Sequence, residues 1–208
     1  MQKLGQFIAI EGASGSGKSS IIKELQNKFD SLIIFTKEPT PQFELSNENK
    51  KQGNTLFELL LQDRSEHVEN EILPALYSGN TIISDRYILS SLVFQRMDGL
   101  DFEYIWSRNV LYPVPNLTVI LTLDEELRAK RLESRLSLSR LKQPEIRLKE
   151  SQYTLEARNF LQLQGWNVVS VNTGTHSLCE TADTIYNLIK TLSHANTSHG
   201  TYYGCNHR

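Results

Sequence analysis

The sequence predicts a three-layer α/β fold, in which helices cover both faces of a doubly wound, parallel sheet of five strands. Short apolar runs alternate with longer helical patterns along the chain, which is typical of such a sheet. A G-x-x-x-x-G-K-S motif joins the first apolar run to the first helical pattern, as in phosphate-binding proteins of this class. A length of 208 residues fits one domain.

The elements are expected to follow one another as alternating strands and helices. Predicted strands cover residues 7–10, 32–35, 81–83, 117–123 and 168–171. Predicted helices include residues 19–28, 125–135 and 178–192. We therefore expect one domain over residues 1–192. The segment 193–208, almost without aliphatic residues, is expected to be a flexible tail.

Composition and charge indicate a soluble globular protein. Hydrophobic residues make up 39% of the chain and charged residues 22%. The formal net charge of −2 and the pI near 6.2 give no general basic surface for nucleic acid or an anionic membrane. No apolar run approaches membrane length, and Cys179 and Cys205 form no metal-binding pair. We expect a cytoplasmic protein without nucleic-acid or membrane partners.

The glycine-rich motif runs from Gly12 to Ser19 and predicts a P-loop. Its glycines allow backbone N–H groups to converge on phosphate oxygens, and the following helix offers the positive end of its dipole. Lys18 should reach the β- and γ-phosphates of ATP, and the Ser19 hydroxyl should bind Mg²⁺. The residues expected to hold this nucleotide are Gly12, Ser14, Gly15, Ser16, Gly17, Lys18, Ser19 and Ser20.

A second signal is the apolar run 81–84, which ends in Asp85. In P-loop enzymes an aspartate at the end of a strand faces the Mg²⁺ beside the phosphates. An aspartate after a strand is also a common turn residue, so the metal role depends on the presence of the P-loop. Ser19 and Asp85 are the expected Mg²⁺ ligands.

A regulatory GTPase is the alternative from another functional class. Residues 27–30, Asn-Lys-Phe-Asp, match the N-K-x-D motif that reads guanine. The motif lies at the end of the first predicted helix, whereas a base-reading loop must come from a distant part of the chain. We therefore interpret these residues as a helix end and a turn.

From Gly5 to about Leu192 the chain resembles thymidylate kinase, a family of P-loop nucleoside monophosphate kinases. Separated segments occur in the family's order: residues 7–12, 37–39, 62–67, 72–79, 85–87, 90–95 and 115–118. The resemblance implies phosphoryl transfer from ATP, with Mg²⁺, to a pyrimidine deoxynucleoside monophosphate, dTMP being the expected acceptor, and a homodimer. A deoxynucleoside kinase is the runner-up. That family shares a D-R-Y block but carries E-R-S before it, where this chain has residues 80–84.

The resemblance also implies roles at the acceptor site. Arg64 and Arg86 would clamp the acceptor monophosphate, because guanidinium groups bind phosphate bidentately. Glu38 would lie near the acceptor sugar and phosphate, and Gln95 would hydrogen-bond the base. The expected acceptor-site residues are Glu38, Leu60, Arg64, Arg86, Ser90 and Gln95.

A basic segment brackets a predicted lid over about residues 135–147. Residues 127–149 contain eight Lys or Arg and two Glu, a local net charge of +6. The variable P-loop positions 13–16 contain no arginine, so the family mechanism requires a lid cation to meet charge on the transferring phosphoryl group. Arg135 and Arg140 are the candidates. The expected catalytic set is Lys18, Asp85, Arg86, Arg135 and Arg140.

Three positions depart from the family pattern. Ser14 replaces an acidic P-loop residue, Leu60 replaces a phenylalanine that stacks on thymine, and Thr40-Pro41 replaces glycines. Leucine keeps an apolar face but loses base stacking, which contributes roughly 1–3 kcal/mol per base in comparable sites. Phe57, one helical turn earlier, is the alternative platform. The reaction class is thus better defined than the base.

If a lid arginine stabilises the transition state, Arg135→Ala or Arg140→Ala should lower kcat more than it raises KM. The reason is that the contact would form only in the closed complex. Steady-state kinetics of both single variants and the double variant measure this. An unchanged kcat in all three would show that the cation comes from elsewhere.

Overall fold

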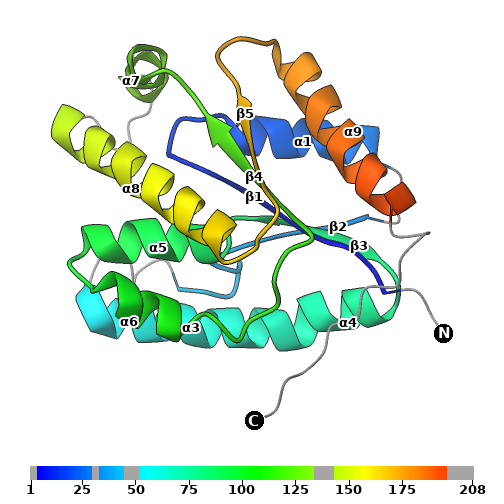
Figure 1. Ribbon diagram of the computed structural model, residues 1–208, viewed down its shortest axis with the longest axis horizontal. Helices are drawn as coiled ribbons and strands as arrows, with labels where there is room; N and C mark the ends of the chain where they lie inside the picture. The colour runs from blue at the N-terminus through cyan, green and yellow to red at the C-terminus, as the bar shows by residue number, and fades with distance from the viewer. Residues whose placement is uncertain (1–3, 30–32, 45–51, 134–142, 196–208) are drawn as a thin grey trace.

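Five parallel strands form one sheet between two layers of helices (Figure 1). The computed structural model describes residues 4–29, 33–44, 52–133 and 143–195. The strand order is β2-β3-β1-β4-β5. The strands are β1 (Phe7–Gly12), β2 (Ile33–Lys37), β3 (Thr81–Asp85), β4 (Leu117–Thr122) and β5 (Val168–Asn172). This confirms the predicted three-layer, doubly wound α/β fold.

Helices fill the connections between the strands. In chain order they are α1 (Lys18–Lys28), α3 (Gly53–His67), the π-helical segment η1 (Val68–Ile72), α4 (Leu73–Tyr77), α5 (Ile88–Met97), α6 (Phe102–Ser107), α7 (Glu125–Glu133), α8 (Pro144–Leu163) and α9 (Leu178–Ala195). Pro74, the second residue of α4, cannot donate a backbone hydrogen bond, and the π-helical segment ends two residues before it. None of the described helices has the length and apolar character needed to cross a bilayer.

The central strand β1 is buried on both sides, which explains its continuous apolar run. Phe7 and Ala9 belong to the core shared with α3, α5 and α8. Ile8 and Ile10, which point the opposite way, belong to the core shared with α1 and α9. The two helical layers in Figure 1 therefore meet alternate side chains of the same strand.

The helix α5 shows why some elements escape prediction from periodicity. Seven of its ten residues are buried, including Ser90, Ser91 and Gln95. A helix that is buried on most sides has no apolar stripe opposite a polar one, so its sequence carries no clear helical pattern. The sequence pattern therefore predicted the strands of the sheet more completely than it predicted the helices that cover the sheet.

The strand order brings three functional segments to one edge of the sheet. β1 pairs with β3 so that Ile10 lies opposite Asp85, and the backbone N–H of Arg86 donates to Ile10 O at 3.0 Å. The N–H of Glu38, just after β2, donates to Asp85 O at 2.9 Å. The carboxyl ends of β1, β2 and β3 thus meet, as ligand-binding edges of parallel sheets do.

Candidate active site

The P-loop follows β1 and turns into α1, and its shape requires glycine. Gly12 and Gly15 have φ angles of 141° and 87°. A side-chain Cβ at Gly12 would lie 2.5 Å from Leu121 O, and one at Gly15 would lie 3.0 Å from Leu132 Cγ. Both positions therefore exclude other residues by backbone conformation and by close packing.

Lys18 is held inside the P-loop. Its Nζ donates to Gly12 O at 2.5 Å and to Ala13 O at 3.2 Å, and the residue is only 7% exposed. Burial and then the positive charge of Arg86 lower the pKa of Lys18 to about 7, although nearby carboxylates, Asp85 first among them, raise it. The amine is thus poised to gain a proton when an anion binds.

Asp85 ends β3 with an oxygen that lacks a partner. Its Oδ1 is buried and accepts no hydrogen bond within the described part of the chain. Buried polar atoms are normally paired, so this oxygen fits a ligand that is bound during function. A hard carboxylate oxygen suits Mg²⁺, for which Ser19, at the start of α1, is the other expected ligand. No group of three or more His, Cys, Asp or Glu among the described residues forms a metal site by itself.

Glu11 links the P-loop strand to α5 and was not identified from the sequence. It is fully buried, and its Oε1 accepts hydrogen bonds from the N–H groups of Tyr87, at 2.7 Å, and Ser90, at 3.2 Å. Its Oε2 accepts from Ser90 Oγ at 2.6 Å. Burial raises the pKa of Glu11 to about 6, against the hydrogen bond from Ser90 and the charge of Arg86. The available signal was one acid in an otherwise apolar strand.

Arg86 follows Asp85 and adopts a left-handed backbone conformation, with a φ of 75°. A residue other than glycine rarely does so unless its surroundings hold it. Here Ser84 Oγ donates to Arg86 O at 2.7 Å. The guanidinium group donates to Ser90 Oγ at 3.1 Å and lies 5.0 Å from the centre of the Phe94 ring. Arg86 therefore lies beside the P-loop with its side chain directed by α5.

A second buried cluster connects the segment after β2 to α3 and to the turn after α6. Arg64 Nε and Nη2 donate to Glu38 Oε2 at 2.8 and 2.6 Å, and Nη1 donates to Asn109 Oδ1. His67 Nδ1 lies 3.0 Å from Glu38 Oε1. Burial raises the pKa of Glu38, but the Arg64 charge and the hydrogen bonds from His67 and Arg64 bring it below its usual value. Arg64 is thus buried and engaged, and its contact with phosphate stays a prediction.

The residues expected near the acceptor base differ in exposure. Leu60 is partly exposed on α3, and Gln95 is buried on α5. Phe57 is wholly buried and packs edge-on against Tyr104, with ring centres 5.8 Å apart. The alternative that Phe57 stacks on the base is therefore wrong, because its ring belongs to the core. Thr40, one of the positions that depart from the family pattern, donates hydrogen bonds from its backbone N–H and its Oγ1 to the carboxylate of Asp63.

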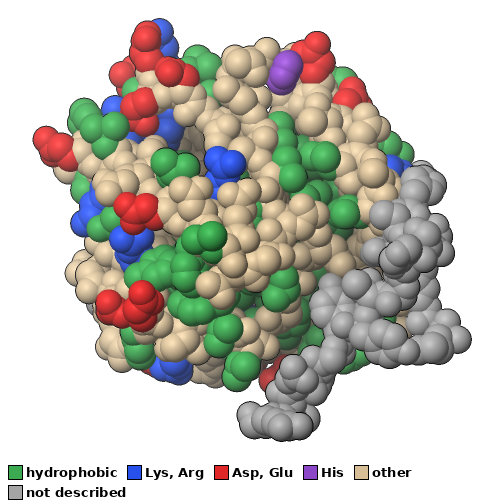
Figure 2. Space-filling model, viewed as in Figure 1, with side chains coloured by type: hydrophobic (Ala, Val, Ile, Leu, Met, Phe, Trp, Pro, Cys, Tyr) green, Lys and Arg blue, Asp and Glu red, His purple; other side chains and the backbone are tan. Residues whose placement is uncertain are grey.

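The lid arginines Arg135 and Arg140 lie outside the described residues. Charged side chains of both signs gather at the edge where α7 and α8 lie, on the left in Figure 2. Arg131 of α7 donates to Thr173 O at 3.1 Å, and its Nη1 is 3.6 Å from the position of a Cβ at Gly17. Ser14, expected to face phosphate, instead donates its N–H to Glu150 Oε1 at 2.9 Å.

These features define a P-loop phosphotransferase. The phosphate-binding loop follows β1, and the neighbouring strand β3 ends in the carboxylate of Asp85, which the cation Arg86 follows. The sequence profile of the family described as thymidylate kinase matches residues 10–180. The chain belongs to the thymidylate kinase family, and so is a nucleoside monophosphate kinase that uses ATP as its phosphoryl donor.

Individual relatives agree with this assignment. The chain is 35% identical to the probable thymidylate kinase of Pyrobaculum calidifontis, over 67% of this chain and 76% of that protein. It is 37% identical to the thymidylate kinase of Desulfotalea psychrophila, over 62% of this chain and 69% of that protein. The solved thymidylate kinase of Candida albicans superposes with a TM-score of 0.74 at 25% identity, covering 93% of this chain and 94% of that one.

ATP binding should take up a proton on Lys18. Its pKa of about 7 makes the amine mostly neutral at pH 8, whereas bound phosphates favour the charged form. The dissociation constant for ATP should therefore rise between pH 7 and 9, approaching about tenfold per pH unit. Calorimetry in buffers of different ionisation enthalpy counts the protons. Lys18→Arg, always charged, should take up none, and a pH-independent affinity of the unmodified protein would contradict the assignment.

Proposed function

We propose that the chain transfers the γ-phosphoryl group of ATP to the phosphate of dTMP, giving ADP and dTDP, with Mg²⁺ at Ser19 and Asp85. One observation carries this proposal. The P-loop after β1 and the Asp85-Arg86 pair after β3 open at the same edge of the sheet, and buried Glu11 bonds the one segment to the other. A donor and an acceptor nucleotide can thus meet there with their phosphates together.

On the donor side, the P-loop amides and Lys18 would bind the triphosphate. Lys18 would exchange its hydrogen bonds to Gly12 and Ala13 for phosphate oxygens and become fully protonated. The Ser19 hydroxyl and the free oxygen of Asp85 would hold Mg²⁺, which offsets charge on the β- and γ-phosphates. Its remaining ligands would be phosphate oxygens and water.

On the acceptor side, Arg86 would bind the monophosphate and direct one of its oxygens at the γ-phosphorus. The bond from that oxygen to phosphorus forms as the bond to the β–γ bridging oxygen breaks, and ADP leaves. Glu38 and Arg64 would border the acceptor, with Arg64 adding positive charge while it stays bound to Glu38 and Asn109. Gln95 would hydrogen-bond the base.

The two alternatives have less support. The N-K-x-D match begins with Asn27 and Lys28 at the end of α1, where Lys28 forms an ion pair with Asp183 of α9 at 2.8 Å. Family membership favours a monophosphate over a free nucleoside as acceptor.

An assay of ADP release with a panel of nucleosides and monophosphates tests the proposal, and activity on nucleosides alone would overturn it. The homodimer and the cytoplasmic location stay predictions.

Base choice should be relaxed because Leu60 cannot stack as an aromatic ring does. We predict phosphorylation of dUMP or a 5-substituted dUMP within about a hundredfold of dTMP in kcat/KM, a gap of roughly 2.7 kcal/mol. The structure of the Candida albicans relative is described as revealing the origin of broad substrate specificity, which supports a relaxed base choice in this family. Leu60→Phe should widen the gap, while Leu60→Met, without a ring, should not. Strict dTMP selectivity of the unmodified protein would refute the prediction.

A further inference from the structure

A buried ion pair attaches the P-loop to α7 and α8. Arg128 of α7 is 2% exposed and Glu150 of α8 is fully buried, and Arg128 Nη2 contacts Glu150 Oε2. Both side chains also bind the same P-loop residue. Arg128 Nε donates to Ser14 O at 2.8 Å, and Glu150 Oε1 accepts from Ser14 N at 2.9 Å. The two groups thus hold both sides of one P-loop residue.

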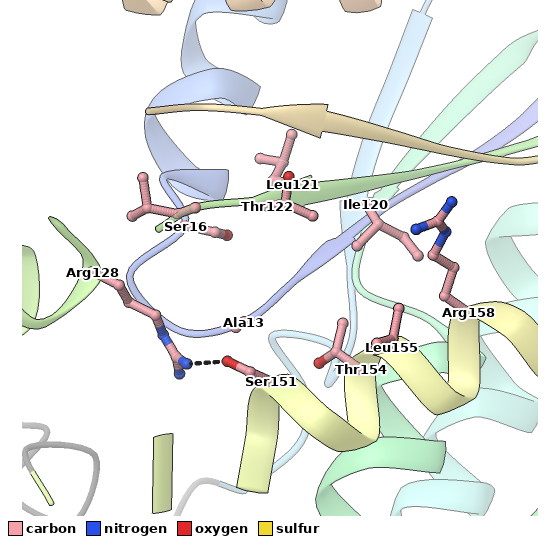
Figure 3. A pocket seen from close by; sticks show the side chains of 11 residues that line it. Ala13, Ser16, Ile120, Leu121, Thr122, Arg128, Ser151, Thr154, Leu155 and Arg158 are labelled. Atoms are coloured by element: carbon pink, nitrogen blue, oxygen red, sulfur yellow. Dashed lines mark hydrogen bonds between the residues drawn. The ribbon is translucent and has the colours of Figure 1, made fainter. Parts of the chain in front are cut away.

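The remaining donors of Arg128 reach the start of α8 and, within α7, Glu125, whose Oε2 accepts from Nη1 at 3.4 Å. Its Nη1 donates to Ser151 Oγ at 2.9 Å and to Arg147 O at 3.0 Å, and Figure 3 shows the bond to Ser151 below the P-loop. Arg128 and Ser151 also line the small cavity between the P-loop, β4 and α8. A buried guanidinium is stable only when its donors are used, and here all three nitrogens have partners. The arrangement is therefore a specific joint of three segments.

The charge of Glu150 is unexpected at this place. A carboxylate bonded to a P-loop amide repels the phosphates that the loop must bind. The negative charge of Glu150 acts on Lys18 in the P-loop. Burial and the charge of Arg86 lower the pKa of Lys18, whereas Glu150 is among the acids that raise it. Contact with Arg128 makes the pair neutral. The arginine thus removes the repulsion that the carboxylate would otherwise add.

We propose that Arg128 and Glu150 are positioning residues for the donor nucleotide. Together they fix the peptide groups on either side of Ser14, and Arg128 neutralises Glu150 so that the P-loop accepts the ATP phosphates. Neither residue touches the reacting atoms. The inference rests on ATP being the donor. It predicts that substituting one partner of the pair changes the affinity for ATP, in a direction set by the sign of the charge on the partner that remains.

Calorimetric titration with ATP of four proteins tests this: unmodified, Glu150→Gln, Arg128→Met and the double variant. Glu150→Gln keeps an acceptor for Ser14 N and leaves Arg128 positive, so ATP should bind at least threefold more tightly. Arg128→Met leaves a bare carboxylate and should weaken ATP binding tenfold or more. Removing that carboxylate in the double variant should restore most of the loss. Glu156→Gln is the matched control and should change nothing, because Glu156 lies on α8 in an exposed pair with Arg96 of α5.

A purely structural role predicts a different pattern. The double variant would then bind ATP no better than Arg128→Met, and KM for dTMP would rise in parallel with KM for ATP. If Arg128→Met does not fold, Glu150→Gln and the double variant still decide, because equal ATP affinities of these two overturn the proposal. ATP binding without phosphorylation of any acceptor by the unmodified protein would refute the proposed function and leave this comparison valid.

Discussion

The buried carboxylate of Glu11 is the interaction on which the geometry of the site depends. It is the penultimate residue of the central strand and accepts three hydrogen bonds from Tyr87 and Ser90 at the start of α5. Burying a carboxylate is costly unless donors surround it, and the pKa of about 6 records that cost. Because β1 leads into the P-loop and Arg86 lies two residues before α5, the Glu11 carboxylate fixes the donor side of the site relative to the acceptor side.

Two further buried glutamates extend the same design. Glu38 joins β2 to Arg64 of α3, and Glu150 joins α8 to Arg128 and the P-loop. Each of the three acids lies at or near the phosphate-binding edge and bonds to groups from other segments. Arg64 and Arg128 are therefore held in defined positions by acids, which also balance their positive charge.

The sequence was sufficient for the sheet and the P-loop, because both are encoded by neighbouring residues. It was insufficient where the partners of a side chain lie far along the chain. Glu11 bonds to residues 76 and 79 positions away, and Glu150 to one 136 positions away, so neither could be assigned without the fold. Phe57 illustrates a different limit: spacing placed it near Leu60, but burial decides which face of α3 it occupies. Asn109, which engages Arg64, had no local signal at all.

Glu11→Gln tests the central claim most directly, since the amide keeps the size of the side chain but cannot accept hydrogen bonds at both terminal positions. The account predicts that kcat for ATP and dTMP falls by at least about tenfold, because the two sites lose their fixed alignment. The dissociation constant for ATP alone should stay within about threefold of that of the unmodified protein, because the P-loop itself is intact. A folded Glu11→Gln variant with unchanged kcat would contradict the account.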